Sequence, residues 1–128
     1  MLRKFPLTLV CIVLIWYLCL FRTPTVRISL LPGFDKWVHI TMYLGSCAMF
    51  WVEYFRSGLN WSWFCLVLVA GLLPIAMSGL IELAQELLTT YRSGDWLDFA
   101  ANSLGVVLAA VALPLWRRLA RWLDGYRS

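Results

Sequence analysis

Four long apolar segments, separated by short polar stretches, limit what this chain can fold into more than any other feature. They run over about residues 6–21, 35–54, 61–88 and 98–115. Hydrophobic residues make up 62% of the 128 residues and charged residues only 14%. A soluble protein of this size cannot hide so much apolar surface, whereas a lipid bilayer accepts it. The sequence therefore predicts a single all-α domain over residues 1–128, a polytopic membrane protein built as a bundle of four transmembrane helices.

The flanking residues refine three of these segments. The first follows basic residues 3–4 and resembles a signal peptide, but residues 22–24 offer no small-x-small cleavage pattern, which favours an uncleaved anchor. The third is long enough to cross a membrane with a tilt or a bend, and Pro74 gives a bend its cause. We expect the fourth helix to end at Pro114, before a basic tail.

The basic residues predict the orientation. With a cytoplasmic N-terminus, seven of them lie on the inner side and four on the outer side, so the positive-inside rule places both termini in the cytoplasm of a bacterial inner membrane. They are spread between the apolar segments and form no single patch, which argues against a nucleic-acid partner. The inner residues are Arg3, Lys4, Arg56, Arg117, Arg118, Arg121 and Arg127.

Polar side chains gather at the predicted outer end of the second segment. Asp35, His39 and Tyr43 are spaced four apart and share one helical face, with Lys36 on its flank. By a rise of 1.5 Å per residue, Tyr43 lies roughly 12 Å inside the helix.

The third and fourth segments carry polar residues at the same level. Glu82 and Gln85 share a face, with Glu82 about 9 Å from the end of the third segment, and Asn102 lies about 6 Å beyond Asp98 in the fourth. Arg92 lies in the connection between these segments. Facing lipid, such groups would be unsatisfied and costly, whereas facing one another they can pair. The sequence therefore predicts one polar pocket near the outer surface.

Small residues predict close helix packing. Ala101, Gly105 and Ala109 recur every four positions along the fourth segment, a spacing that lets a neighbouring backbone approach. Gly79 leaves room for a partner beside the third segment.

Each polar group also has a structural explanation. The two aspartates can cap helices, the two cations can extend to the interface, and Tyr43 and Asn102 can bond neighbouring helices. Glu82 and His39 are the candidates for proton transfer if a reaction occurs, because buried ionisable groups in membranes usually serve a function. Whether the protein is an enzyme stays open. With one histidine and no cysteine near it, a metal site is not expected, and no cofactor is expected either.

Taken together, these residues resemble the VanZ-like family of small bacterial membrane proteins, over about residues 35–109. The resemblance implies a multi-helix inner-membrane protein; the name-giving member is associated with low-level teicoplanin resistance, which is not carried over to this chain. Residues 87–91 lack the Pro-Gly often seen before the family's arginine. The matching motifs are Asp35-Lys36-x-x-His39-x-x-x-Tyr43, Glu82-x-x-Gln85, Arg92 and Asp98-x-x-x-Asn102-x-x-Gly105.

The leading functional hypothesis is a site that binds or processes an anionic or glycosylated lipid-linked compound of the cell envelope. In it Lys36 and Arg92 hold an anion, while Gln85, Tyr43 and Asn102 position the headgroup. Asp35 or Asp98 would orient the imidazole. The rival hypotheses are a non-enzymatic interaction protein whose polar cluster locks the bundle, and a small transporter, for which a homo-oligomer stays open.

Overall fold

A computed structural model describes residues 2–20, 34–88 and 96–127, the side chains of residues 34, 35 and 127 excepted. Its regular structure within these ranges is helical, which confirms the predicted all-α class. A short 3-10 turn, η1, precedes the helices. The elements are η1 (Leu2–Lys4), α1 (Pro6–Leu20), α2 (Phe34–Ser57), α3 (Trp63–Val67), the π-helical turn η2 (Leu68–Leu72), α4 (Leu73–Leu88) and α5 (Trp96–Arg127).

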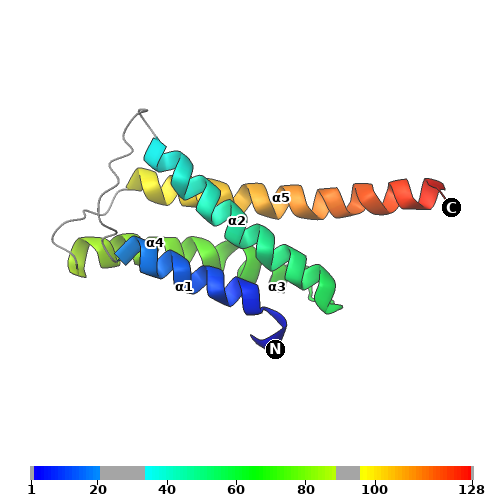
Figure 1. The fold of residues 1–128 in the computed structure, drawn as a ribbon, viewed down its shortest axis with the longest axis horizontal. Coiled ribbons are helices and arrows are strands. Elements are labelled where there is room, and N and C mark those ends of the chain that lie inside the picture. Colours follow the sequence, from blue (N-terminus) through cyan, green and yellow to red (C-terminus); the bar gives the residue numbers. More distant parts are fainter. Residues whose placement is uncertain (1, 21–33, 89–95, 128) are drawn as a thin grey trace.

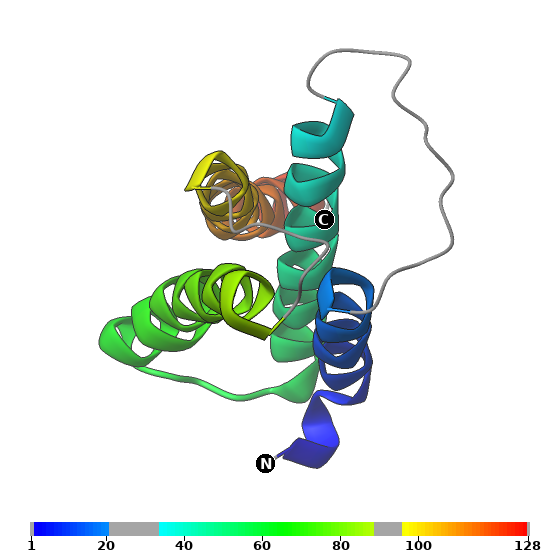
Figure 2. The same ribbon diagram turned by 90° about the vertical axis from the view of Figure 1, so that its left-hand side faces the viewer.

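Four rods make up the bundle, because α3, η2 and α4 form one continuous helical stretch over residues 63–88. Helix α2 packs mainly against α5, α4 packs on α5, and α1 lies against both α2 and α4 (Figures 1 and 2). The beginning of α1 and the end of α5 lie towards the same end of the bundle (Figure 1). The far end holds the end of α1, the beginning of α2, the end of α4 and the beginning of α5.

The third rod is disturbed next to Pro74. Proline has no N–H, so the carbonyl of Ala70 loses its usual helical partner. The turn η2 ends at Leu72, two residues before the proline, and the Leu73 N–H bonds to the Leu68 carbonyl five residues earlier. Next to Pro74 the structure thus has a π-helical turn, and the predicted bend stays a prediction.

Helix α5 does not end at Pro114, so the predicted end of the fourth helix is wrong. The helix continues for thirteen residues to Arg127, and Pro114 lies inside it. A proline removes one backbone donor and crowds the preceding turn, but the residues that follow it here are mostly leucine, arginine and alanine, which favour helix.

The first turn of α1 is capped by a residue of another helix. Pro6 opens α1, and the Phe5 side chain before it cannot accept a hydrogen bond. The Glu53 carboxylate of α2 accepts from the backbone N–H groups of Leu7 (2.8 Å) and Thr8 (2.9 Å), and from the Thr8 hydroxyl (2.6 Å). An acceptor at this position satisfies donors that a helix start leaves free. Glu53 thereby fastens the start of α1 to α2.

Close packing between α2 and α5 depends on the predicted small-residue face. A Cβ atom added at Gly105 would lie 2.6 Å from the Ile40 carbonyl oxygen and 3.0 Å from the Leu44 nitrogen, so only glycine fits there. Ala101 and Ala109, one turn before and after it, are buried. A Cβ atom at Gly79 would lie 3.3 Å from the Phe99 ring, so the partner beside Gly79 is α5. The predicted close approach along this face is confirmed.

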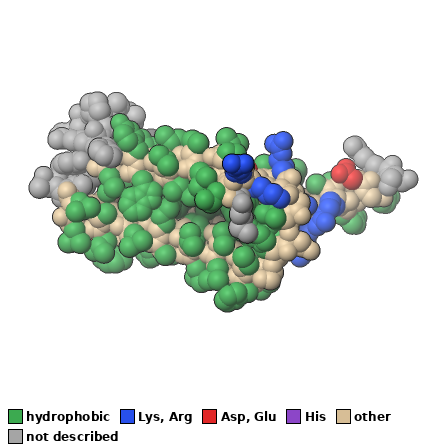
Figure 3. Space-filling view, turned by 90° about the horizontal axis from the view of Figure 1, so that it is seen from below, with side chains coloured by type: hydrophobic (Ala, Val, Ile, Leu, Met, Phe, Trp, Pro, Cys, Tyr) green, Lys and Arg blue, Asp and Glu red, His purple; other side chains and the backbone are tan. Residues whose placement is uncertain are grey.

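Two helical stretches are long and apolar enough to cross a membrane. They are Trp63–Leu88, with a mean hydropathy of 2.4 over its best window, and Trp96–Tyr126, with 1.8. Only 17% and 28% of those windows are buried, whereas the core helix of a soluble protein would be mostly buried. Hydrophobic side chains cover much of the face seen in Figure 3. Helix α1 is apolar but has only 15 residues, and α2 does not meet the same criterion, so a count of four spans stays a prediction.

Candidate functional site

A chain of polar contacts links α2, α5 and α4 at the end of the bundle where α2 and α5 begin. Its first link is an ion pair between the Lys36 ammonium and the Asp98 carboxylate. One turn further along α2, the His39 Nε2 atom lies 3.5 Å from the other Asp98 oxygen. A single carboxylate of α5 therefore faces both a cation and an imidazole of α2.

Asn102 continues this chain of polar contacts to α4. The Asn102 side-chain oxygen lies 3.0 Å from His39 Nδ1, and the Asn102 amide nitrogen donates to the Ser78 hydroxyl of α4 over 2.8 Å. Because the amide oxygen can only accept, His39 Nδ1 is the donor, and the ring is oriented by Asn102. This arrangement leaves Nε2 directed at Asp98.

Burial increases along this chain of contacts. About 30% of the Lys36 side chain is exposed and 13% of the Asp98 side chain, while Asn102 and Ser78 are almost wholly enclosed. The row of contacts from Lys36 through Asp98, His39 and Asn102 to Ser78, called the polar chain below, is therefore accessible from outside at Lys36, its open end, and enclosed at Ser78, its closed end. A molecule approaching from outside meets the Lys36–Asp98 pair first.

Tyr43 and Glu82 lie beside the closed end. Tyr43 is 1% exposed and its hydroxyl group, near Ser78 and Glu82, makes no hydrogen bond of ordinary geometry within the described residues. Glu82 is also buried and follows Ser78 by one helical turn on the same face of α4. Both predicted side chains point into the protein.

Gln85 makes a different contact. Its amide nitrogen donates to the Cys19 carbonyl oxygen over 2.7 Å, which joins the last turn of α1 to α4. A carbonyl in the last turn of a helix has no partner within that helix. This bond holds the end of α1 against the bundle, just as Glu53 holds its beginning.

Four of the nine predicted site residues are in direct polar contact, namely Lys36, His39, Asp98 and Asn102. Tyr43 and Glu82 lie next to them, and Gln85 faces α1. The side chain of Asp35 and the whole of Arg92 lie outside the described residues. Asp98 is the third residue of α5, inside its first turn, so the alternative that it caps that helix does not hold.

Two important residues were missed at the sequence level. Ser78 lies four positions before Glu82, so the same spacing argument that joined Asp35, His39 and Tyr43 would have found it. Glu53 is absent from the predicted site residues, although it anchors the start of α1. Its signal was indirect: the turn that begins at Pro6 lacks a capping side chain of its own and needs an acceptor from elsewhere.

The assembled groups offer a defined range of chemistry. One cation, one carboxylate, one imidazole and one carboxamide lie in sequence from the open end inwards, so the site can exchange hydrogen bonds with hydroxyl, amide or anionic groups. Across the ranges that the structure covers, no three histidine, cysteine or acidic side chains lie together as metal ligands. Comparisons of the chain with protein-family models, curated proteins and solved structures returned no match.

Proposed function

We propose that this is an integral membrane protein with four spans, of the VanZ-like kind, whose polar site binds or processes an anionic or glycosylated lipid-linked compound of the cell envelope. The observation that carries the proposal is the polar chain from Lys36 to Ser78, which is open at one end and enclosed by three helices. These contacts lie at the end of the bundle where α2 and α5 begin, and in a bilayer that end of an apolar bundle would lie at the level of the lipid headgroups.

The residues at the open end suit such a headgroup. A phosphate or carboxylate would compete with Asp98 for the Lys36 ammonium, and a sugar hydroxyl would donate to Asp98. Arg92, which the sequence places in the connection before α5, would add a second cation. If a reaction occurs, His39 is the group to move a proton, because Asn102 holds its ring with Nε2 turned to Asp98.

The second candidate function is a membrane interaction protein in which the polar chain only locks the helices. A specific observation favours it: Lys36, His39, Asn102 and Ser78 each already have a protein partner. Buried polar networks of this kind give helix bundles a unique arrangement without binding anything.

Native mass spectrometry of the purified protein tests the two candidates. Under the proposed function a phospholipid or glycolipid remains bound to the natural chain and is lost from the Lys36→Met and Arg92→Gln variants. The matched control is Arg118→Gln, an exposed cation on the C-terminal part of α5, which keeps the lipid. A spectrum of the natural chain without any lipid would favour the interaction protein.

A cellular measurement separates binding from structural locking. Glu82→Gln and His39→Ala change the envelope-lipid composition at normal protein level if the site acts on a lipid. If the site only locks the bundle, the same variants lower the amount of protein, and any change in envelope-lipid composition is proportional to that loss of protein.

A further inference from the structure

A pocket of about 400 Å³ lies where the start of α1 meets the last turns of α2, at the end of the bundle that holds the N-terminus (Figure 1). Three of its lining residues are cations, so we call it the basic pocket. The lining residues are Arg3, Lys4, Pro6, Leu7, Val52, Glu53, Arg56 and Ser57. The basic pocket therefore lies at the opposite end of α2 from Lys36.

The basic pocket carries an excess of positive charge. Glu53 is its one acidic lining residue, and both oxygens of this carboxylate already accept hydrogen bonds from the first turn of α1. Arg3 and Arg56 are exposed, and neither forms an ion pair with an acidic side chain within residues 2–20, 34–88 and 96–127. Cations that line one pocket repel one another, and an anion placed between them removes that cost.

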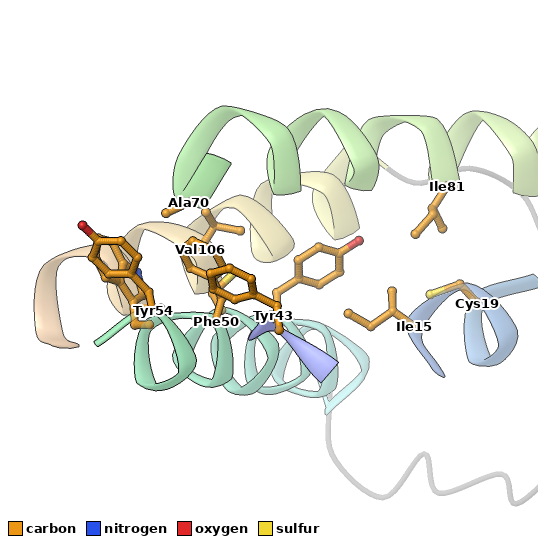
Figure 4. Close-up of a cluster of buried hydrophobic side chains, with 12 residues drawn as sticks. Ile15, Cys19, Tyr43, Phe50, Tyr54, Ala70, Ile81 and Val106 are labelled. Carbon is orange, nitrogen blue, oxygen red and sulfur yellow. The ribbon is translucent and has the colours of Figure 1, made fainter. Parts of the chain in front are cut away.

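The protein holds the cation-bearing turn η1 in place. The Lys4 ammonium donates to the Ser57 carbonyl at the end of α2 over 3.3 Å. Phe5, the next residue, is buried, and its ring stacks on Phe50 with the centroids 5.4 Å apart. Phe50 also stacks on Tyr54, and Figure 4 shows these two side chains next to each other on α2. The backbone of η1 is thus fixed beside the end of α2, so a ligand that binds there loses less entropy in ordering it.

The end of α2 explains only part of this cluster. Cations near the end of a helix interact favourably with its last carbonyl groups. That role accounts for Lys4, which bonds to the Ser57 carbonyl, and for Arg56 in the last turn of α2. It does not account for Arg3, which lies in η1 and lines the same pocket.

The walls of the basic pocket indicate which kind of anion it suits. The planar guanidinium group matches the oxygen atoms of phosphate in a two-pronged bond. Beside the cations, Leu7 and Val52 line the pocket and are 52% and 41% exposed. A free phosphate ion would leave these apolar side chains uncovered, whereas a phospholipid carries hydrocarbon close to its phosphate and would cover them.

We propose that the basic pocket binds the phosphate group of an anionic phospholipid, with Arg3 and Arg56 on the phosphate oxygens and Leu7 and Val52 against the hydrocarbon that follows. This site goes beyond the proposed function, whose polar chain lies at the other end of α2, and it does not depend on that function. It gives the protein a specific lipid contact at the end where α1 begins.

Titration with phosphatidylglycerol, followed by native mass spectrometry of the full-length protein in detergent, tests this inference. We expect the Arg3→Gln/Arg56→Gln double variant to raise the apparent Kd for one phosphatidylglycerol about tenfold or more. The matched control is Arg118→Gln/Arg121→Gln, which removes two exposed cations of α5 outside the pocket and should change that Kd by less than about twofold. Equal weakening by both pairs would overturn the inference, because net charge alone would then attract the lipid.

The Lys36→Met variant separates this site from the polar chain. We expect Lys36→Met to keep the phosphatidylglycerol that depends on Arg3 and Arg56. If the polar chain binds a lipid as well, the natural chain carries one lipid more than Lys36→Met. A failure of the proposed function therefore removes only that additional lipid. Loss of all bound phosphatidylglycerol in Lys36→Met would overturn the basic pocket as a site.

Two other ligands test the source of the phosphate. Phosphatidylcholine carries the same phosphate beside a cation, so we expect it to bind about threefold or more weakly than phosphatidylglycerol. Inorganic phosphate at about 10 mM should not displace the lipid, because it gains nothing from Leu7 and Val52. Equal binding of the two lipids, or displacement by inorganic phosphate, would overturn an anionic phospholipid as the ligand.

A charge-conserving pair guards against loss of structure as the cause. Arg3→Lys/Arg56→Lys keeps both positive charges, so its apparent Kd should stay within about threefold of the natural value. Thermal unfolding should be the same for this pair and for the glutamine pair, since both arginines are exposed. A lysine pair that binds no better than the glutamine pair would overturn the inference.

Discussion

The two sides of α2 differ in how closely they are packed. Towards α5, Gly105 brings two backbones into contact and Ala109 is wholly buried. Towards α1 and α4, large aromatic and aliphatic side chains leave a cavity of about 320 Å³. One helix thus carries a rigid interface on one side and a space that can be filled on the other. Substitutions of equal size should therefore have opposite consequences on the two sides.

The largest expected effect comes from adding the same ring to both sides. Ala109→Phe forces a ring into the α2–α5 interface and should lower the free energy of unfolding by about 3 kcal/mol or more. Ala70→Phe places its ring in the cavity and should change it by less than about 1 kcal/mol. Titration of the two variants with sodium dodecyl sulfate in detergent micelles measures both values. Similar losses would mean that the cavity side is packed as tightly as the α5 side.

A single methyl group should give the next largest effect. In Gly105→Ala the new Cβ atom meets backbone atoms of α2, which cannot rotate away, so we expect a loss of about 2 kcal/mol. Gly45→Ala, with nothing within 4 Å of the added atom, should cause no loss and even a small gain in helix propensity. The same titration checks this pair, and a loss in both variants would place the close contact elsewhere.

Removing the carboxamide that joins three helices should have an intermediate effect. Asn102→Ala leaves His39 and Ser78 without their shared partner and should lower the free energy of unfolding by about 1.5 kcal/mol. Ser103→Ala is the control, since the Ser103 hydroxyl donates to the Phe99 carbonyl of its own helix over 2.9 Å. Thermal unfolding followed by tryptophan fluorescence compares them, and an Asn102 variant as stable as its control would show that the polar chain does not lock the bundle.

The smallest effect is expected at the start of α1. Glu53→Ala removes the acceptor for three donors, but this lies at the end of the bundle where solvent can replace it, so we expect about 1 kcal/mol. Hydrogen exchange should nevertheless quicken at the Leu7 and Thr8 amides. Glu86→Ala, an exposed acid on α4, should leave these amides protected. Unchanged exchange in Glu53→Ala would mean that another group holds α1.

The sequence predicted what depends on helical spacing. Lys36 and His39 share one helical face, Asp98 and Asn102 share another, and the two faces meet because polar groups pair with one another where the rest of the helix surface is apolar. Ala101, Gly105 and Ala109 also lie four apart, so they form one face of small side chains, and this face packs closely against α2. Patterns within one helix were therefore enough to identify its inward side.

The sequence could not predict which helix each inward side would meet. Gln85 shares a face with Glu82, yet it bonds to the end of α1, because the order of helices around the bundle decides its neighbour. Glu53 bonds to a helix start that lies 45 residues away in the sequence. The cavity also depends on three rods at once, and no spacing rule within one segment reveals a space between segments.

The distance between the charged residues at the two ends of α5 can be compared with the thickness of a bilayer. Asp98 and Arg117 lie nineteen residues apart on this one helix, a separation of about 28 Å. The hydrocarbon layer of a bilayer is about 30 Å thick. In a membrane, therefore, the arginines that begin at Arg117 meet the phosphates of one leaflet when the Lys36–Asp98 pair reaches those of the other. In a bilayer this spacing along α5 would set the depth of the protein, so lengthening the helix by one turn between these two points would draw one charged end into the hydrocarbon or raise the other out of it.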